Sequence, residues 1–334
     1  MKKCAFIIPY FGRFPKSFAV FLKSCASNPN YDWLVFTDDK TKYQYPKNVK
    51  VKYMSYKNLT ELIDEKFGFT VAMDHPYKLC DLKPAYGFIF EEYIQEYKVW
   101  GHCDIDTVLG DLDTFLTDSL LAEYDKLFCL GHMTLYKNTF DNNRVFMSVH
   151  NGQCLYQQVY KNPASCWFDE EWHDANNVNQ IFLAQNKKVL EVDLSANFST
   201  KTQRFSRVEY RVDKETRGYI EEGLVDALYV WDNGHIYRLR CKDNELVKDE
   251  YLYIHLQHRK MRFKDEVLSA PYFKIVPNSY IKLKKLPMSV MDFRLVRKSA
   301  LSFYALNRLC KYQKKRLDRW KHKIMIATSR WRKR

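Results

Sequence analysis

The strongest constraint on the fold is a regular exchange of short apolar runs and amphipathic segments in the first hundred residues. The apolar runs have the length of buried strands and lie at residues 4–10, 31–37, 49–54 and 99–103. Between them, apolar side chains recur at helical spacing over residues 15–25, 58–67 and 81–96. Strands that alternate with helices predict an α/β fold with a parallel or mixed sheet covered by helices.

The rest of the chain adds fewer and shorter signals. Residues 127–130 and 251–256 are strand-like, residues 174–185 are helix-like, and residues 229–239 predict a hairpin that turns at Asp232-Asn233-Gly234. We expect Asn58 to cap the second helix and Asp113 to cap a helix that carries Leu116. A chain of 334 residues favours one large domain with appendages over several small modules.

An acidic triplet, Asp104-Ile105-Asp106, directly follows the strand at 99–103. In extended chain, side chains two residues apart point the same way, so both carboxylates can bind one cation. Open α/β sheets bind ligands beyond the carboxyl ends of their strands, where this triplet lies. The triplet type alone is uninformative, because Asp111-Leu112-Asp113 repeats it and about two are expected by chance.

His255 lies in the apolar run at 251–256 and is followed by a basic cluster. An imidazole beside two carboxylates suits a manganese-type site. The alternative for His255 is a packed or hydrogen-bonded histidine, and for Lys260 a solvated charge.

Several segments together resemble a bacterial capsule and lipopolysaccharide glycosyltransferase family. They are IIPYFG, WLVFTDD, PYKLCDLKPAYG, WGHCDIDTVLGDL, LGHMTLYKN and IHLQHRKM, and they span roughly residues 4–262. That family is similar to GT-A-fold enzymes such as glycogenin and the lipopolysaccharide galactosyltransferases, which carry a DxD motif and a late His with a downstream Lys. The resemblance implies a GT-A-like, Rossmann-type mixed sheet flanked by helices. It also implies transfer of a hexosyl unit from a UDP-sugar to a capsule, O-antigen or lipopolysaccharide acceptor, with Mn²⁺ or Mg²⁺ as cofactor.

The resemblance also implies roles for single residues. Asp104, Asp106 and His255 would bind the metal, with Asp104 also close to the nucleotide sugar, and Lys260 would hold a phosphate. The relatives place that lysine six residues after the histidine, whereas this chain places it five residues after.

Further donor-binding residues follow from the same resemblance. A loop after the first strand would flank the nucleotide base, and two acids after the second strand would accept hydrogen bonds from uracil and ribose. A third group, before the acidic triplet, would contact the donor sugar or its phosphates. The three groups are Pro9, Tyr10 and Phe11; Asp38 and Asp39; and Lys78, Asp81 and Lys83. Turn, cap and helix-start residues are the alternative interpretation for all of them.

Residues 168–174 concentrate carboxylates beside aromatic rings. The carboxylates of this segment are suited to recognise acceptor hydroxyls and to act as a catalytic base, and they belong to Asp169, Glu170 and Asp174. A capped helix that begins near Asp174 explains the same residues.

The formal charge of +14 belongs to the end of the chain. Residues 281–334 hold 18 Lys and Arg against two Asp, which leaves 36 basic and 38 acidic residues in residues 1–280. We therefore expect a catalytic domain at 1–280, with a nucleotide-sugar half at about 1–115 and an acceptor half at about 116–262. We expect residues 281–334 to form a basic helical tail for membrane association.

From Phe303 to Trp331, apolar or neutral residues recur every three or four positions, and seven basic residues lie between 311 and 323. This pattern indicates a cationic amphipathic helix on an anionic membrane surface. Packing on the body or on another subunit, and nucleic-acid binding, are the alternatives.

The location follows from three absences in the sequence. The nine cysteines form no CxxC pair, Pro9 and Gly12 interrupt any signal-peptide core, and no apolar run reaches 18 residues. We expect a cytoplasmic protein, peripheral on the inner face of the cell membrane. The opposing function class is a non-catalytic peripheral membrane or nucleic-acid-binding protein that acts through its tail.

The tail generates the first prediction. Deletion of residues 300–334 should abolish sedimentation with liposomes that contain anionic lipid, because each basic residue near such a surface contributes about 1 kcal/mol. Equal sedimentation of the full chain with neutral liposomes contradicts the membrane interpretation. Competition by DNA at physiological salt favours the nucleic-acid alternative.

Overall fold

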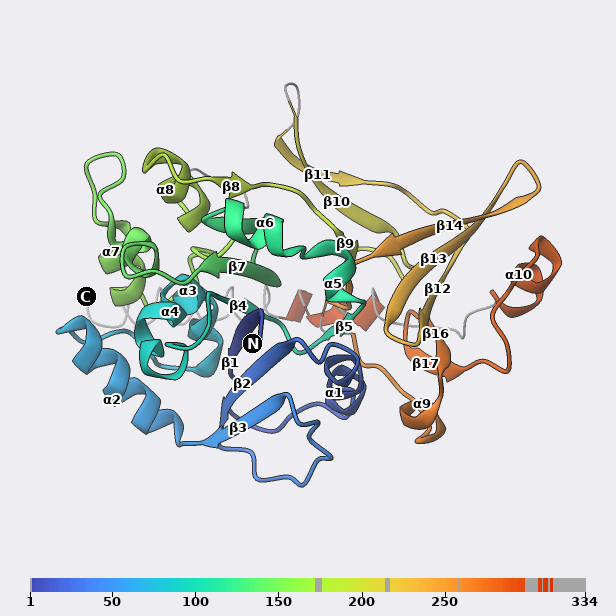
Figure 1. The fold of residues 1–334 in the computed structure, drawn as a ribbon, viewed down its shortest axis with the longest axis horizontal. Helices are drawn as coiled ribbons and strands as arrows, with labels where there is room; N and C mark the ends of the chain where they lie inside the picture. Colours follow the sequence, from blue (N-terminus) through green and yellow to red (C-terminus); the bar gives the residue numbers. More distant parts are fainter. Residues whose placement is uncertain are drawn as a thin grey trace, which may run out of the picture.

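A computed structural model describes residues 2–171, 176–213, 217–257, 259–297, 306–307, 309–311 and 313–314. Within them the chain forms three sheets, with helices on both faces of the largest (Figure 1). The expected α/β class, a Rossmann-type mixed sheet flanked by helices, is confirmed.

The largest sheet has seven strands in the order β3-β2-β1-β4-β7-β6-β8. These are β3 (Val49–Tyr53), β2 (Tyr31–Thr37), β1 (Cys4–Pro9), β4 (Val99–Cys103), β7 (Met133–Lys137), β6 (Lys126–Leu130) and β8 (Val189–Leu190). Strands β1 to β4 run parallel, and β7 is antiparallel to both β4 and β6. The predicted strand at 31–37 is confirmed over its full length.

Two apolar cores cover the two faces of this sheet. Along β1, Ala5 and Ile7 belong to one core and Cys4, Phe6 and Ile8 to the other, as the alternation of side chains in a strand requires. The first core includes α2 (Tyr56–Phe67), α4 (Tyr86–Ile89), α7 (Leu155–Lys161) and α8 (Val178–Ala184). The second includes α1 (Phe18–Ala26), α5 (Leu112–Phe115) and α6 (Asp118–Glu123).

Two five-stranded sheets continue the fold beside α1. One has the order β11 (Arg217–Glu221), β10 (Arg207–Val212), β9 (Ser195–Phe198), β15 (Tyr253–His255) and β5 (Thr107–Leu109). The other has the order β14 (Glu245–Tyr251), β13 (His235–Lys242), β12 (Ala227–Asp232), β16 (Tyr272–Val276) and β17 (Ser279–Lys282). Figure 1 shows β5 and β9 between the largest sheet and the sheet of β12 to β14.

The last sheet is attached to the N-terminal half by a few specific contacts. The indole of Trp231 donates to the carbonyl of Leu109 at 3.1 Å, and the ammonium of Lys23 lies 4.7 Å from the centre of the Trp231 ring. The β12–β13 hairpin turns at Asn233-Gly234, as predicted, with both residues in the left-handed region. Gly234 lies so close to Ser27 that a Cβ there would be 3.1 Å from the serine Cβ.

The remaining helical segments are short. They are α3 (Leu79–Leu82), α9 (Glu266–Ser269), α10 (Val290–Val296) and the 3₁₀ turns Pro76–Lys78, Lys83–Ala85, Glu91–Tyr93 and Asn142–Met147. The single helix predicted at 81–96 is wrong, because the chain breaks into short α and 3₁₀ pieces there. Pro84 lacks an amide proton for the helix ladder. Gly87 packs against Trp100, whose ring would lie 2.3 Å from a Cβ at that position.

Two further expectations need correction. The run at 251–256 is two strands, since Tyr251 pairs with Ile236 in one sheet and Tyr253 pairs with Leu109 in another. The predicted caps are also displaced: Ser55 caps α2 in place of Asn58. Asp111 caps α5 in place of Asp113, which binds Lys3 and Tyr31.

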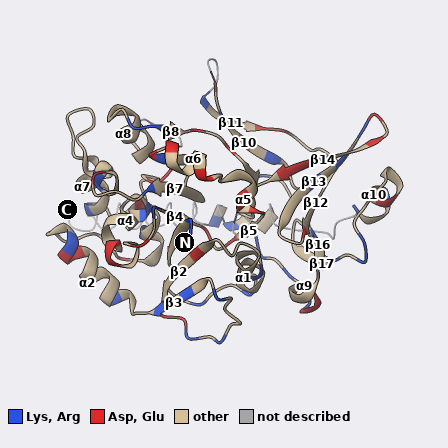
Figure 2. Cartoon of the chain, viewed as in Figure 1, with Lys and Arg blue, Asp and Glu red and all other residues tan. Residues whose placement is uncertain are grey.

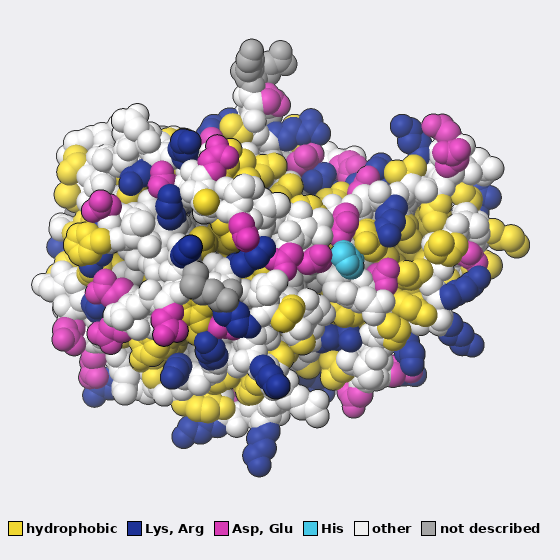
Figure 3. Space-filling model, viewed as in Figure 1, with side chains coloured by type: hydrophobic (Ala, Val, Ile, Leu, Met, Phe, Trp, Pro, Cys, Tyr) yellow, Lys and Arg dark blue, Asp and Glu magenta, His cyan; other side chains and the backbone are white. Residues whose placement is uncertain are grey.

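Charge is well mixed over the body. Figure 2 shows basic and acidic residues on all parts of the ribbon, and Figure 3 shows them interspersed over one face of the molecule. All nine cysteines have free thiols. No helix in the described part of the chain is both long and apolar enough to cross a bilayer.

The cap of α2 provides the second prediction. Ser55→Ala should lower the free energy of unfolding by about 1 kcal/mol, because the Ser55 hydroxyl accepts from the amide of Asn58 at 3.1 Å. The matched control is Glu65→Ala, at an exposed position of the same helix, which should change the free energy of unfolding by less than about 0.5 kcal/mol. Urea unfolding of both variants measures the difference, and equal losses contradict the assignment of Ser55 as the cap.

Candidate metal centre

The site forms where β4 ends and two sheets meet. Asp104 follows the last residue of β4, and its amide donates to the carbonyl of His132 at 3.0 Å. Residues 104–106 then turn the chain into β5, which pairs antiparallel with β15 so that Thr107 opposes His255. The amide of Leu256 donates to the carbonyl of Asp106 at 3.0 Å. This pairing holds the histidine against the acidic turn.

Three candidate metal ligands converge there. The His255 Nε2 lies 3.5 Å from Asp106 Oδ1 and 3.9 Å from Asp104 Oδ2. One ligand atom from each of the three residues lies within 4.8 Å of the others, and His255 is buried. Two carboxylates and an imidazole fit a divalent cation such as Mn²⁺ or Mg²⁺ and leave positions open for other oxygen ligands.

The tautomer of His255 is set by Asn197 on the neighbouring strand β9. The side-chain oxygen of Asn197 accepts from the backbone amide of Phe198 at 3.0 Å and from the side-chain amide of Gln257 at 2.8 Å, so it is an acceptor. It also lies 3.2 Å from His255 Nδ1, which therefore carries the proton. The lone pair of Nε2 faces the two aspartates, as in histidines that ligate metals.

The electrostatics of the cluster favour a cation. Burial alone would lower the pKa of His255, but the carboxylates of Asp106 and Asp104 outweigh it and raise that pKa. Two carboxylates that face one buried imidazole make this position attractive to positive charge. A divalent ion would meet the same attraction.

Lys83 links the metal cluster to the predicted acceptor acids. Its Nζ lies 2.8 Å from Asp104 Oδ1 and 3.3 Å from Asp169 Oδ2, and it donates to the carbonyl of Gly131 at 2.7 Å. Burial opposes the charge of Lys83, but the two carboxylates outweigh burial and raise its pKa. Burial raises the pKa of Asp169 to about 7, and burial also raises the pKa of Glu170.

Gly131 is required for this close approach. A Cβ there would lie 2.5 Å from Asp169 Oδ2 and 3.1 Å from Glu170 Oε2. The structure therefore brings five predicted residues into one cluster: Asp104, Asp106, His255, Lys83 and Asp169, with Glu170 beside them.

Lys78 and Asp81 lie elsewhere, fully buried and bonded to each other at 2.8 Å. Lys78 also donates to the carbonyls of Val159 and Ala164. Their position gives them a structural task, and their contact with a donor stays a prediction.

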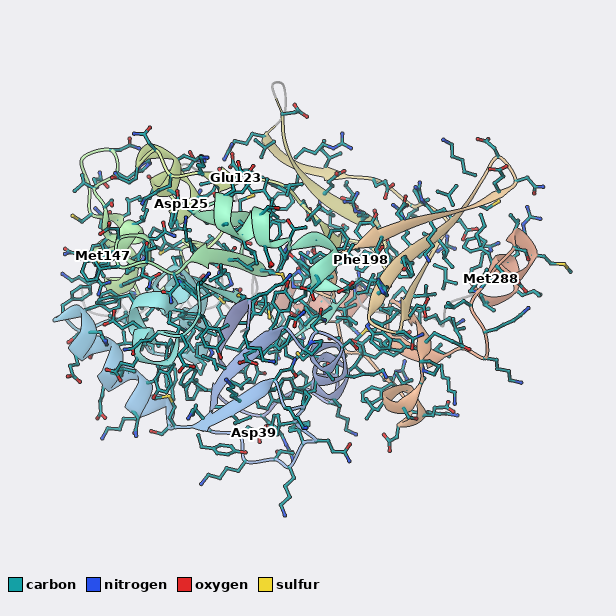
Figure 4. The ribbon with its side chains drawn as sticks, in the orientation of Figure 1. Asp39, Glu123, Asp125, Met147, Phe198 and Met288 are labelled. Atoms are coloured by element: carbon teal, nitrogen blue, oxygen red, sulfur yellow. The ribbon has the colours of Figure 1, made fainter. Side chains whose placement is uncertain are left out.

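The loops after β1 and β2 are bound to each other. Asp38 accepts from the amide of Gly12 at 2.8 Å, and Asp39 accepts from the amide of Phe14 at 2.9 Å. Figure 4 places Asp39 on the long connection below β3. These bonds use the two acids as turn and cap residues.

The predicted base-flanking residues are only partly accessible. Phe11 is buried against Tyr56, whereas Pro9 and Tyr10 are half-buried. Burial, with smaller contributions from the charges of Asp106 and Asp39, raises the pKa of Tyr10. A role for all of these residues in nucleotide binding stays a prediction.

Lys260 and Asp174 are the remaining predicted site residues. Lys260 is exposed in the chain that follows β15. Asp174 lies outside the described residues.

Sequence reasoning missed the residues that support the metal ligands. Asn197 orients His255. The ring of His132 packs on the ring of His255 with their centres 4.4 Å apart, and Nδ1 of His132 lies 2.6 Å from the Tyr253 hydroxyl. No local pattern marks Asn197, because its contact depends on the pairing of β9 with β15. The segment LGHMTLYKN contained His132 but did not distinguish it.

The fold and the site define an α/β protein with a candidate divalent-metal centre at the carboxyl end of a central strand. The chain belongs to DUF6625, described as a family of unknown function, whose model matches residues 6–284. No curated protein sequence matches it.

Among solved structures, the chain is similar to an active-site mutant of LgtC, at 12% identity and a TM-score of 0.33 over 58% of this chain and 74% of that one. It is also similar to mouse xyloside xylosyltransferase 1 in its apo form, at 8% identity and a TM-score of 0.34 over 60% of this chain and 88% of that one. Function must be argued from the residues of this chain.

The metal centre provides the third prediction. Asn197→Ala should weaken Mn²⁺ binding by about 10- to 100-fold, because the imidazole loses the acceptor that orients it. Asp106→Asn should weaken Mn²⁺ binding further still, because it removes a charged ligand. Isothermal titration calorimetry measures both.

Two variants serve as controls for this prediction. Asn197→Asp keeps an acceptor and should retain binding. Asp118→Asn changes an exposed carboxylate that pairs with Lys3 at 3.1 Å, and should match the wild type. Unchanged Mn²⁺ affinity in Asn197→Ala contradicts the role of Asn197.

Proposed function

We propose that the protein is a metal-dependent glycosyltransferase. It transfers a hexosyl unit from a UDP-sugar to a cell-surface glycan acceptor of the capsule, O-antigen or lipopolysaccharide kind. The observation that carries this proposal is the convergence of the Asp104 and Asp106 pair with His255, which is distant from them in the chain, within 4.8 Å at the end of β4. The motifs between residues 4 and 262 that resemble such enzymes support it.

Transfer from a nucleotide sugar leaves a diphosphate whose negative charge must be stabilised. A divalent cation on the three ligands would supply that stabilisation as a Lewis acid. The residues of the chain prepare the site: Asn197 holds His255 in the tautomer that presents Nε2. The ammonium of Lys83 holds the Asp104 carboxylate at 2.8 Å, so that carboxylate is already ordered and loses no conformational entropy when a metal ion binds.

Asp169 and Glu170 face the acceptor in this proposal. Both carboxyls are largely buried next to Lys83, and burial raises both pKa values. A carboxyl whose pKa is about 7 exchanges a proton readily near neutral pH, which suits an acid or base that handles an acceptor hydroxyl. Asp174 belongs to the same acidic segment and keeps its predicted role.

The donor would lie between the metal ligands and the loops after β1 and β2. Tyr10, with Pro9 and Phe11, would flank the base, and Asp38 or Asp39 would accept from uracil or ribose. Lys260 would hold a phosphate, and Lys78 and Asp81 act through the loop that they anchor.

We place the protein on the inner face of the membrane, where lipid-linked acceptors are available. Within the basic tail, α10 and the residue before its N-cap support this location, because Met288, Met291 and Leu295 are 82%, 73% and 69% exposed. Figure 4 shows Met288 projecting from that end of the molecule. The same segment carries exposed basic residues at Lys282, Lys284, Lys285, Arg294 and Arg297. Apolar side chains in a basic setting suit an anionic bilayer surface.

The fourth prediction tests donor binding. Calorimetry should detect UDP binding in the presence of Mn²⁺, and EDTA should abolish it, because the diphosphate oxygens complete the coordination of the ion. Asp106→Ala should remove UDP binding without lowering the melting temperature.

Asp118→Ala is the matched control and should bind UDP as the wild type does. UDP binding that survives EDTA, or no UDP binding at all, contradicts the proposed function. A screen of UDP-sugars for Mn²⁺-dependent hydrolysis then identifies the donor.

A further inference from the structure

Trp167 has a backbone conformation that its side chain disfavours. Eight described residues other than glycine have φ in the left-handed region, and five of them are Asn or Asp. The other three are Phe128, Trp167 and Gln257. Trp167 has φ 53° and is 52% exposed, so neither its conformation nor its burial explains a large apolar ring there. Strain of this kind persists where surrounding bonds impose it, and it collects at functional sites.

The surrounding bonds are visible on both sides of Trp167. The carboxylate of Asp81 accepts from the amides of Cys166 and Phe168, at 3.0 and 3.2 Å. The Nζ of Lys78 donates to the carbonyl of Ala164 at 2.9 Å. Phe168 itself is fully buried. The buried Lys78–Asp81 pair thus fixes the loop while the ring of Trp167 stays half exposed.

The same loop carries the acids of the proposed acceptor site. Asp169 is two residues further on, and the amide of Glu170 donates to the carbonyl of Trp167 at 3.4 Å. The amide of Glu171 donates to the carbonyl of Cys129 on β6 of the largest sheet, at 2.9 Å. Trp167 is therefore part of the same fixed loop as Asp169, whose carboxylate contacts Lys83.

A second exposed aromatic side chain belongs to this region. Tyr77 is 54% exposed and directly precedes Lys78. Partial burial, with smaller contributions from Cys80 and Asp169, raises the pKa of Tyr77 to about 12. Its neighbour Lys78 donates to the carbonyl of Ala164, so Tyr77 precedes a residue that is bonded to the segment carrying Trp167 and Asp169.

Packing does not account for either ring. In the part of the chain that the structure describes, neither Trp167 nor Tyr77 stacks on another aromatic ring or forms a side-chain hydrogen bond. Exposed aromatic faces beside a few polar groups are typical of ligand sites, because the ring covers an apolar ligand surface while the polar groups select its orientation.

We propose that Trp167 and Tyr77 form an aromatic subsite that stacks on the C–H face of a pyranose ring of the acceptor, while Asp169 and Glu170 accept hydrogen bonds from its hydroxyls. This inference rests on the proposed function and adds the class of ligand that the acceptor side recognises. The subsite is distinct from the metal ligands, so it binds sugar without contributing to Mn²⁺ or UDP binding.

The test uses the full chain with Mn²⁺ and UDP bound. The probes are the methyl glycopyranosides of glucose, galactose and N-acetylglucosamine, and saturation-transfer NMR with a concentration series measures their affinity. Trp167→Gly removes the ring and relieves the left-handed strain, so it should keep or raise the melting temperature. Sugar affinity should fall by about tenfold or more, as for other central aromatic contacts.

Tyr77→Ala has a closely matched control. Tyr53 is also 54% exposed, on β3, so Tyr53→Ala removes an equal aromatic surface away from the subsite. Sugar affinity should fall in Tyr77→Ala and stay at the wild-type value in Tyr53→Ala. Both variants should retain Mn²⁺-dependent UDP binding.

Two results overturn the inference. One is wild-type sugar affinity in both Trp167→Gly and Tyr77→Ala, and the other is a wild-type protein that binds UDP with Mn²⁺ but none of the three glycosides. Absence of UDP binding in the wild type is a separate result, which contradicts the proposed function itself.

Discussion

The antiparallel pairing of β15 with β5 is the constraint on which the candidate site depends. β5 begins one residue after the acidic turn, and the register Thr107 opposite His255 places the imidazole over that turn. On its other side β15 pairs with β9 in parallel, with His255 opposite Asn197. One short strand of three residues therefore brings together the ligands and the residue that orients one of them. A shift of this register by one residue would turn His255 to the other face.

The sequence predicted the parts of the fold that local patterns determine. Residues 31–37 form a strand buried on both faces, and their sequence, apolar except for Asp32 and Thr37, indicated it. Asp104 and Asp106 were identified because they directly follow such a strand. His255 was assigned by resemblance, and the pairing that brings it to the aspartates is not a local pattern.

The expectations that failed depend on tertiary contacts or on small offsets in sequence. The helix predicted at 81–96 is broken by the 3₁₀ turn Lys83–Ala85, which contains Pro84, and Gly87 within α4 packs on the ring of Trp100. Ser55 and Asn58 are both good capping residues three positions apart, and only the start of α2 distinguishes them. Asn197 could not be identified, because an asparagine in a strand has no local signature of a partner on another strand. Buried polar residues of this kind become interpretable only once the sheet is known.

Lys83 lies between two carboxylates. Its ammonium is 2.8 Å from Asp104, a candidate metal ligand, and 3.3 Å from Asp169. The lysine also donates to a carbonyl and is well satisfied, and removal of Lys83 would leave both carboxylates without their shared counter-charge. One side chain thereby connects the candidate metal ligands to the acidic segment at 169–170.

The attachment of the β12–β17 sheet to α1 has a consequence for any attempt to divide the chain. Trp231 is bonded to Leu109, Lys23 covers its ring, and the Asn233-Gly234 turn touches Ser27, so residues from opposite ends of the sequence share one interior. A fragment that stops near residue 262 would lack β16 and β17 and would leave one edge of β12 without its partner. Limited proteolysis should therefore find no stable core ending there, and homologues that are shorter by this sheet would need another surface to shield Val20, Val108 and Ile254.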